Sequence, residues 1–599
     1  MEISLLMIIT VVIYLIATAI FGYIGYKQTK SSTDFLVAGR KQHPMVMALS
    51  YGATFISTSA IVGFGGAAAT MGMGMLWLTF LNIFAGIFIA FVYFGKRTRK
   101  MGHSLDAHTF PELMGRRYES RFIQGASGLL IFLFMPLYAG AVMIGGAVFL
   151  QQVFGINYEV ALLFFAAITA IYVIFGGMKG VMYTDAFQGA IMFIGMAILL
   201  VFTYVKLGGV VTAHEKLTAL SAMVPAGMKA GGHQGWTSMP KFASPMWMAL
   251  ITTLVMGVGL GVLAQPQLSV RFMTVKSNKE LNRAVLIGGI FILMMTGVAF
   301  TVGALTNVYF VEKYNMISLD VTKADPAVLK AMDEGTYVPP KEEANKPAEP
   351  VKAAAATTAN QATGEKAPLV QPPARKATPD NIIPMYIAKA MPVWFTTLFM
   401  ITLLAAAMST LSSQFHTMGT ALSRDFYEKG LDVKSKNTLL LNKVGTGIGI
   451  VFAVIVAWLL PKAIEGGSNI IAIGTSLFFG LCAAAFIPMY IGALYSKTVT
   501  KTAAIASFLI GSLTSLFWMT FFHTKESAAL KICKFIFNKD TLATSPVIAT
   551  LDPIVVGLPV SFIVIILVSL MTKKTDEKHL AKCFEGIYNK KTAKAEKGR

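Results

Sequence analysis

The sequence predicts an all-α polytopic membrane protein with about 13 transmembrane helices. Of its 599 residues, 55% are apolar and only 14% are charged, and the mean hydropathy is +0.63. Soluble domains carry about 25% charged residues, so this chain has too little charge to cover the several domains that its length would otherwise form. Apolar segments of about 20 residues recur along it, which is the length a helix needs to cross a bilayer. These observations exclude a soluble enzyme, a disordered chain and a coiled coil.

The expected spans are separated by polar or basic breaks. They lie at about 3–25, 45–70, 74–95, 123–153, 159–177, 183–206, 246–266, 285–311, 391–423, 443–460, 469–495, 502–522 and 553–571. The first is too long for the core of a signal peptide and lacks a small-residue cleavage site, so it is kept as a helix. Thirteen spans would put the two termini on opposite sides of the membrane.

Basic residues concentrate in the loops on one side of these spans. Of the 51 Lys and Arg residues, 32 fall around 26–43, 96–121, 178–182, 271–284, 424–443, 496–501 and in the tail from 572. The positive-inside rule then places the N-terminus outside and the C-terminus in the cytoplasm of a plasma membrane of the bacterial inner-membrane type. We expect the basic tail to lie near anionic lipid headgroups and not to bind nucleic acid.

The order of the spans suggests two repeats with additions at both ends. Residues 1–43 form an extra helix and a basic loop, 44–206 the first repeat, 246–311 and 391–495 the second, and 496–599 two further helices and the tail. An outside loop, 312–390, interrupts the second repeat. Its middle, about 337–380, is rich in Ala, Pro, Lys and Glu and is expected to be disordered, as a spacer or, alternatively, a tether for a partner.

The second span contains an unusual mixture of hydroxyl side chains and glycines. Its polar and small residues are Thr54, Ser57, Thr58, Ser59, Gly63, Gly65 and Gly66. Glycine costs about 1 kcal/mol per residue in a helix relative to alanine, and hydroxyls can satisfy backbone groups in an unwound turn. The segment is therefore either a broken helix whose carbonyls face a cavity or a helix that packs closely through small residues; the sequence favours neither.

The seventh span is interrupted in the same way. Gly257, Gly259 and Gly261 precede Gln265 and Pro266. Paired interrupted segments in the two halves of a transporter point to a binding site near the middle of the membrane. Spans 2 and 7 run in opposite directions, so spans 2–6 and 7–11 would form two five-helix units of inverted topology.

The ninth span places two hydroxyls, Ser409 and Thr410, within one turn of the Ala406 carbonyl. Several neutral oxygens suit a monovalent cation that must be released in each cycle. Packing through small residues is the alternative. Ser412 is expected to lie on a different face of this helix.

Three segments carry a family resemblance. GGMKGVMYTDAFQG (176–189), AQPQLSVRF (264–272) and AAAMSTLSSQ (405–414) are similar to the sodium:solute symporter family over essentially the whole chain apart from the 337–380 insert. The resemblance implies the leucine-transporter fold, a 5+5 inverted repeat that works by alternating access, with Na+ as the coupling ion and no organic cofactor.

The resemblance also implies a sodium site and a residue on the sodium path. The site consists of the carbonyls of Ala53, Ile56 and Ala406 and the hydroxyls of Ser409 and Thr410. In the family's Thr-Asp-x-x-Gln motif, Asp185 is similar to the carboxylate linked to the sodium exit path. The alternative for Asp185 is a cap at the start of a helix near the cytoplasmic interface.

The solute is less well defined by these motifs. Phe55 and Val262 replace an aspartate and an aromatic gate residue of the proline-transporting branch, and the second span is more similar to the pantothenate and monocarboxylate branch. We therefore expect symport of a small organic acid, with a proline-like amino acid or a transporter-like solute sensor as alternatives. No buried arginine is apparent as a clamp for a carboxylate. Candidate solute contacts are Thr54, Ser57, Thr58, Gly257, Val262, Gln265 and Pro266.

Other functional classes lack their motifs in this sequence. There is no P-loop for an ATP-driven pump, no catalytic cluster for an enzyme, and the three cysteines Cys482, Cys533 and Cys583 show neither disulfide nor metal spacing. A proton-coupled carrier would have ionisable residues deep in its spans; Asp185 and Asp425 stand near span ends, and His416 is interpreted as a packing residue. The sequence leaves the oligomeric state open.

Overall fold

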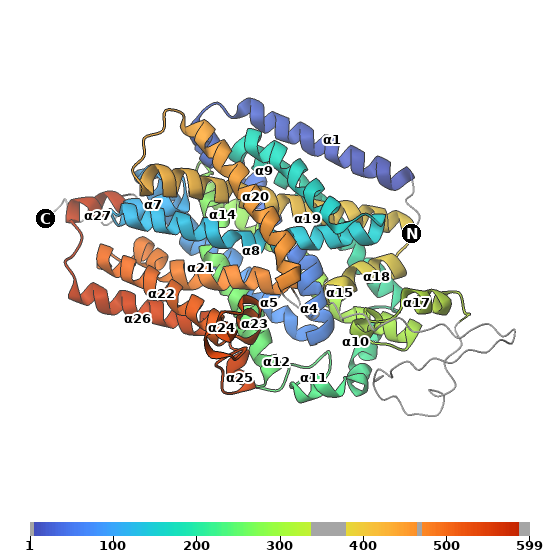
Figure 1. Cartoon of the computed structure of the whole chain (residues 1–599). Helices are drawn as coiled ribbons and strands as arrows, with labels where there is room; N and C mark the ends of the chain where they lie inside the picture. Colours follow the sequence, from blue (N-terminus) through green and yellow to red (C-terminus); the bar gives the residue numbers. More distant parts are fainter. Residues whose placement is uncertain (1–4, 337–378, 464–469, 586, 588–599) are drawn as a thin grey trace.

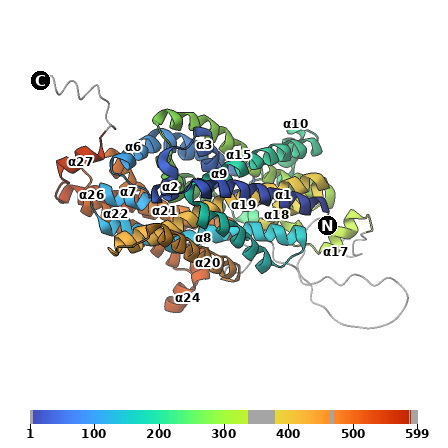
Figure 2. The same ribbon diagram turned by 90° about the horizontal axis from the view of Figure 1, so that it is seen from above.

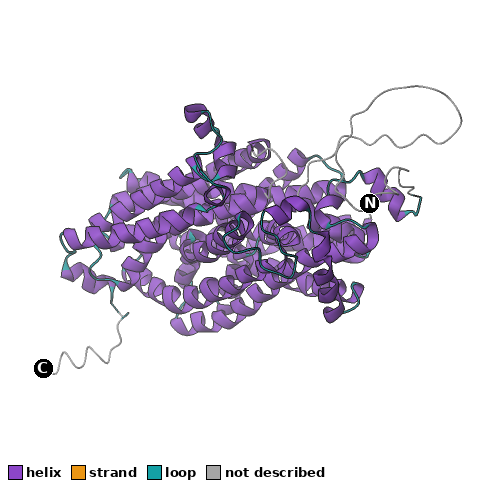
Figure 3. Ribbon diagram, turned by 90° about the horizontal axis from the view of Figure 1, so that it is seen from below, coloured by secondary structure: helices purple, strands orange, loops and turns teal. Residues whose placement is uncertain are grey.

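Eleven helices are long and apolar enough to cross a membrane among the described residues, which are 5–336, 379–463, 470–585 and 587 of this computed structural model. They are α1 (Leu5–Gln28), the run Ser59–Ser104, α8 (Arg121–Phe154), α9 (Tyr158–Lys206), the run Pro245–Ala264, α15 (Asn278–Tyr314), the run Val393–Gly430, α20 (Thr438–Ala463), α21 (Ile470–Tyr495), α22 (Lys501–Phe521) and α26 (Pro553–Met571). Figure 3 shows the described chain as helices joined by loops.

The expected count of thirteen differs from eleven because two pairs of expected spans run together without a loop. One pair forms α9, in which Gly177 has a non-helical backbone (φ 54°, ψ −155°). A Cβ built on Gly180 would lie 3.4 Å from the carbonyl oxygen of Tyr172, eight residues earlier, whereas a straight helix would separate them by about 12 Å. The chain therefore folds back at Gly177.

The other pair forms the run Ser59–Ser104. It consists of η2 (Ser59–Gly63), α4 (Phe64–Met71), η3 (Gly72–Met75), α5 (Leu76–Ile83), η4 (Phe84–Gly95) and α6 (Lys96–Ser104). Gly72 has a φ of 76°, and the carbonyl of Gly86 accepts a hydrogen bond of 2.9 Å from Tyr51. Because Tyr51 precedes the run, this contact requires that the chain returns past its own start.

Shorter helices connect the long ones. Those named below are α2 (Ser32–Val37), α3 (Pro44–Phe55), α7 (Phe110–Arg117), α10 (Val210–Ala219), η6 (Ala249–Val258), α13 (Gly259–Gly261), η7 (Val262–Ala264), α14 (Pro266–Ser269), η8 (Val270–Met273), α16 (Ser318–Val321), α17 (Pro326–Asp333), η9 (Pro379–Asn381), α18 (Ile382–Ala390) and α27 (Glu577–Cys583). Several begin at side-chain caps, which satisfy the free amides of a first turn: Ser31 caps α2 and Thr109 caps α7.

The run Val393–Gly430 lies at the centre of the bundle. It comprises α19 (Val393–Thr420) and η10 (Ala421–Gly430), and α19 packs against α8, α9, α20 and α3. In contrast, α1 and α26 lie toward the outside of the bundle (Figures 1 and 2) and expose Leu, Ile and Val side chains. Such outward apolar surface suits contact with lipid tails. The segments predicted to be functional in the second, sixth and seventh spans lie against α19, which carries the segment predicted in the ninth span.

The two ends of the chain lie toward opposite ends of the bundle. Figure 1 places the start of α1, α10 and α17 toward one end and α7 and α27 toward the other. This separation agrees with an odd number of crossings, while the side that faces the cytoplasm stays a prediction. The loop 312–390 contains α16, α17, η9 and α18.

Most of the predicted insert, 337–378, lies outside the described residues, as does 588–599 of the basic tail. The predicted range, about 337–380, overlaps the described residues at its last two positions. Pro379 and Asp380 are buried in η9, and the Pro379 carbonyl lies against Gly66.

Candidate functional site

The second predicted span is a broken helix. α3 ends at Phe55, Ile56 is extended (φ −93°, ψ 104°), and helical structure resumes at about Ser59. A continuous helix would bond the Ala53 and Thr54 carbonyls to amides four residues later. The break frees these carbonyls, so the interpretation as a helix that only packs closely is wrong.

The freed carbonyls face the hydroxyls of α19. Ser409 donates to the Ala53 carbonyl (2.9 Å) and to the Ala406 carbonyl (3.3 Å). Thr410 donates to the Thr54 carbonyl (3.1 Å) and to that of Ala53 (3.4 Å). The structure thus brings together Ala53, Ala406, Ser409 and Thr410. All of these side chains are buried, and the oxygens are neutral.

Ile56 is the exception among the five predicted sodium ligands. It lies at the break and is buried, but its carbonyl takes no part in these hydrogen bonds, whereas the Thr54 carbonyl does. The sequence reasoning assigned Thr54 to the solute. Its backbone therefore belongs to the oxygen cluster.

Asp185 lies directly beside this cluster and not at the start of a helix. It is fully buried within α9. Its Oδ2 accepts hydrogen bonds from Ser50 (3.0 Å) and Thr54 (3.1 Å), and its Oδ1 accepts one from Ser412 (2.8 Å). The alternative of a helix-start cap is therefore wrong. Ser412 was expected to lie on a different face of this helix, but it contacts this carboxylate.

The partner of Asp185 is Arg271, which the sequence reasoning missed. The guanidinium Nη2 lies 2.9 Å from Asp185 Oδ2 and 2.5 Å from the Ser413 hydroxyl, and Nε donates to Ser50 (3.1 Å). Neither side chain of the pair is exposed. Arg271 was counted as a loop residue, and no buried arginine was apparent from the sequence as a clamp for a solute carboxylate; the structure shows Arg271 buried and paired with Asp185.

Arg271 is buried because the seventh predicted span is broken before it. Gln265 has an extended backbone (φ −68°, ψ 118°), and Pro266 begins α14, which continues into η8. The chain therefore stays inside the protein for eight more residues. A guanidinium six residues after the break is the signal that could have indicated an internal position.

A small cavity of about 20 Å³ lies beside the first break. Only one predicted solute residue, Ser57, lines it. The other residues that line the cavity are Phe55, Ile56, Ala60, Phe64, Leu78, Asn82, Tyr138, Val258, Thr296, Phe300, Thr475 and Phe479. All of the lining side chains are uncharged. Most of these residues stand alone in apolar spans, so no sequence pattern could identify them.

The remaining predicted solute residues lie elsewhere. Thr58 donates to the Val142 carbonyl (2.8 Å), and the Thr54 hydroxyl belongs to the Asp185 network. Gly257 lies in η6 near Ser476, and Val262 packs near Gly86. Gln265 donates weakly to Gly261 (3.4 Å), and Pro266 lines a second cavity. The predicted set is therefore divided among several environments.

Comparisons with known proteins agree with this architecture. The model of the sodium:solute symporter family matches residues 35–334 and 367–511. Sodium/proline symporter 2 of Staphylococcus saprophyticus is 27% identical over 520 residues, covering 85% of each chain. A sodium/proline symporter of Staphylococcus aureus is 26% identical over 575 residues, covering 94% of this chain and 93% of the relative.

A solved structure extends the comparison to the fold. It is described as the substrate-bound outward-open state of a Na+-coupled sialic acid symporter, has a TM-score of 0.67 at 16% identity, and covers 96% of this chain and 99% of its own. This likeness confirms the predicted class, an all-helical membrane protein with the leucine-transporter-like arrangement. The family consists of transporters and not enzymes.

Proposed function

Because the chain belongs to the sodium:solute symporter family, we propose that it couples the entry of sodium to the uptake of a small amino acid of the proline class. The predicted sodium ligands support the coupling half of this proposal. Ser409 and Thr410 donate to the carbonyls freed by the helix break, and a cation placed among these neutral oxygens would replace hydrogen bonds with ion contacts.

The cavity beside the break is the candidate site for the solute. Its uncharged walls do not provide a cationic side chain for an organic acid. The helix that resumes at about Ser59 has its amino end next to Ser57 and Ala60 of the wall, and such an end favours a carboxylate. A carboxylate is common to both solute classes, so it does not decide between them.

Asn82 supplies the observation that favours an amino acid. Its Oδ1 is buried, lines the cavity and has no hydrogen-bond partner among the described residues. A buried acceptor without a donor costs about 1–3 kcal/mol. The ammonium group of an amino acid would supply that donor, as would a hydroxyl or amide of pantothenate, whereas a simple monocarboxylate has none. The names of the relatives also favour the amino-acid alternative over the organic acid expected from the sequence.

Phe55 is the residue that distinguishes this chain from the proline branch. It stands where that branch has an aspartate, and its ring lines the cavity. Gly86 lies between Phe55 and Val262, the second departure. We therefore place the solute in the class of small amphiphilic amino acids without restricting it to proline.

Uptake into proteoliposomes tests the proposal. Labelled proline, other small amino acids, pantothenate and short monocarboxylates are compared in sodium and in choline buffer, with and without a protonophore. We expect saturable amino-acid uptake that needs inward sodium and persists when the proton gradient is collapsed. Uptake of organic acids alone would support the expectation from the sequence instead, and solute binding without uptake would support a sensor.

Asn82→Leu tests the assigned contact. It should raise the KM for the amino acid by about 5- to 150-fold, which corresponds to a lost interaction of 1–3 kcal/mol. Thr79→Val is the matched control, because Thr79 is also buried on α5 and does not line the cavity, and its hydroxyl has no hydrogen-bond partner in the described part of the chain. Equal effects of both variants would remove Asn82 from the solute site.

A further inference from the structure

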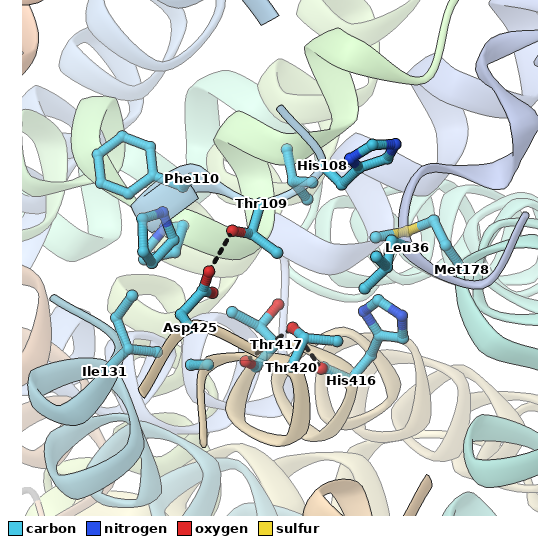
Figure 4. Close-up of a pocket in the computed structure, with 14 residues that line it drawn as sticks. Leu36, His108, Thr109, Phe110, Ile131, Met178, His416, Thr417, Thr420 and Asp425 are labelled. Carbon is cyan, nitrogen blue, oxygen red and sulfur yellow. Dashed lines mark hydrogen bonds between the residues drawn. The ribbon is translucent and has the colours of Figure 1, made fainter. Parts of the chain in front are cut away.

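A second cavity lies at the opposite end of α19 from the helix start. Its volume is about 10 Å³, and it lies between α2, α7, α8, α14 and the end of the run Val393–Gly430. Figure 4 shows Asp425, Thr417, Thr420 and His416 on one wall and Thr109 and His108 on the other. We call this space the Asp425 cavity. None of its residues was assigned to sodium or solute apart from Pro266.

Asp425 is fully buried, and only one of its two carboxylate oxygens accepts hydrogen bonds from the described residues. Its Oδ1 accepts hydrogen bonds from the Thr109 hydroxyl and the Gln124 amide, both at 2.8 Å. Its Oδ2 is buried and has no hydrogen-bond partner among the described residues. A buried carboxylate oxygen without a donor or a counter-ion is costly, so it needs a cation or a proton from outside the protein.

The neighbouring guanidinium, that of Arg424, already forms an ion pair with Glu112. Arg424 contacts Glu112 three times, with Nε to Oε2 at 3.2 Å and Nη2 to both oxygens at 3.0 and 3.1 Å. Burial alone would raise the pKa of Glu112, but its hydrogen bond from His108 and the guanidiniums of Arg424 and Arg116 lower it well below its usual range. Glu112 therefore remains charged and holds Arg424, which leaves Asp425 without a full counter-charge.

The imidazoles of the cavity are not directed at Asp425 as partners. His416 donates through Nε2 to the Phe35 carbonyl (2.8 Å). His108 lies 3.6 Å from Glu112 and from Asp106. The charged and titratable groups around the cavity are thus Glu112, Arg424, Arg116, Asp106 and the two histidines.

A stripe of oxygens on α19 extends from the predicted sodium site to this cavity, with the Arg271 guanidinium bonded to Ser413 between them (2.5 Å). Along α19, Ser409, Ser413, Thr417 and Thr420 recur at intervals of three or four residues, which places them on one face. The carbonyl of Ser409 accepts from Ser413 (3.3 Å), and Thr420 donates to the Thr417 carbonyl (3.2 Å). The stripe covers about 16 Å of helix.

A change of helix type brings Asp425 into line with the stripe. From Ala421 the chain is a π-helix, η10, in which hydrogen bonds join residues five apart. Asp425 therefore lies over Thr420, and both line the cavity. In a continued α-helix, residues five apart would lie on different faces.

We propose that the Asp425 cavity is a second binding site for a monovalent cation, sodium in this protein, at the far end of the path from Ser409. Asp425 Oδ2 supplies the charge, and the hydroxyls of Thr109, Thr417 and Thr420 surround the ion. The inference rests on the sodium coupling proposed above. Sodium would bind transiently at this charged site after it leaves the neutral oxygens.

Direct binding of 22Na+ to the purified full-length protein tests the proposal. Scintillation proximity measurements are made without solute on the wild type, Asp425→Asn, Ser409→Ala and Asp432→Asn. Asparagine keeps an oxygen for Thr109 and Gln124, so the packing is retained. Asp432→Asn is the matched control, because this carboxylate is 63% exposed and pairs with Arg121 on the surface.

We expect wild-type binding to have two components. Asp425→Asn should remove one or weaken it by more than about tenfold, Ser409→Ala should affect the other, and Asp432→Asn should match the wild type. If Asp425→Asn does not fold, Thr420→Val provides the same measurement, with a smaller weakening of the same component.

Failure of the proposed sodium coupling and failure of the Asp425 site alone give different results. A wild type that binds no 22Na+ would overturn the proposed sodium coupling and this site together. A single component that Ser409→Ala weakens and Asp425→Asn leaves unchanged would overturn this site alone. Competition by protons that depends on Asp425, without sodium binding there, would show a proton site instead.

Discussion

The guanidinium of Arg271 and the carboxylate of Asp185 form an ion pair of 2.9 Å in which neither side chain is exposed. The pair joins the segment after the second break to the middle of α9, and Ser50, Thr54, Ser412 and Ser413 surround it. It lies next to the neutral oxygens of Ser409 and Thr410. We therefore expect this pair to rearrange when sodium leaves the proposed site along α19.

The first prediction concerns the energetic coupling of the pair. Asp185→Asn and Arg271→Gln should each destabilise the purified protein by about 3–5 kcal/mol, because each leaves one buried charge without its partner. The double variant should lose less than the sum. Thermal unfolding of all three variants in detergent measures the effect.

The exposed pair Arg121–Asp432 is the control for that experiment. Its N···O distance is 2.7 Å, but its side chains are 71% and 63% exposed. Surface pairs contribute about 0–1 kcal/mol, so Asp432→Asn should change the melting temperature little. Additive effects of Asp185→Asn and Arg271→Gln would contradict the assigned coupling.

The second prediction concerns the sodium ligands. Ser409→Ala and Thr410→Val each remove one oxygen from a neutral cluster, so each should raise the sodium concentration for half-maximal uptake by about 5- to 150-fold. Solute affinity should change much less at saturating sodium but should fall at low sodium, because coupling between two ligands is reciprocal. Uptake assays at graded sodium concentrations measure both.

Thr397→Val is the matched control on the same helix. Thr397 is buried, and its hydroxyl only donates to its own helix, to the Val393 carbonyl (3.0 Å). Ser412 is unsuitable as a control because it contacts Asp185. If Thr410→Val and Thr397→Val had the same sodium dependence as the wild type, the cluster would be a packing contact and not an ion site.

The third prediction concerns a close approach of two helices. Gly303 of α15 faces the backbone of Gly65 in α4, and a Cβ at Gly303 would lie 2.2 Å from the Gly65 carbonyl oxygen. Gly303→Ala must separate the helices and should cost about 1–3 kcal/mol. Gly447→Ala in α20 meets nothing within 4 Å and should be neutral or stabilise by up to about 1 kcal/mol. Equal melting temperatures for the two variants would contradict this packing.

The sequence was sufficient for the features that depend on local composition. Hydropathy predicts the fold class, and the glycines before Gln265 and Pro266 predict the interruption there. For the second span the sequence left a broken helix and close packing open, and the structure has the break at Ile56. The grouping of Ser409 with Ala53 was implied by the family resemblance, and the structure places a hydrogen bond between them. The expected spans were separated at 70–74 and 177–183, where the structure reverses the chain at Gly72 and Gly177; the count differs because the helices on either side of each turn form one continuous run. Glycines with positive φ reverse the chain within an apolar segment.

The sequence was insufficient where function depends on contacts between distant residues. Arg271 is basic, and basic residues are counted as loop residues unless a buried partner is known. Its partner, Asp185, is 86 residues away. Asn82 and Asp425 are single polar residues whose unpartnered oxygens become informative only when the surrounding side chains are placed.

The last prediction concerns the boundary of the insert. The sequence of 340–376 predicts a segment without a core, so replacing it with a Gly/Ser linker of the same length should leave uptake within about twofold of the wild type. Extending the replacement through 380 should reduce stability by about 1–3 kcal/mol. Asp380 Oδ2 accepts from the Ile471 amide (3.4 Å), and the Pro379 carbonyl lies against Gly66 beyond the helix break. Uptake and melting temperature of both variants, at matched amounts of protein, separate these outcomes. Loss of uptake with the shorter replacement would show that the insert itself acts in transport. No loss of stability with the longer one would show that η9 does not hold α4 and α21 together.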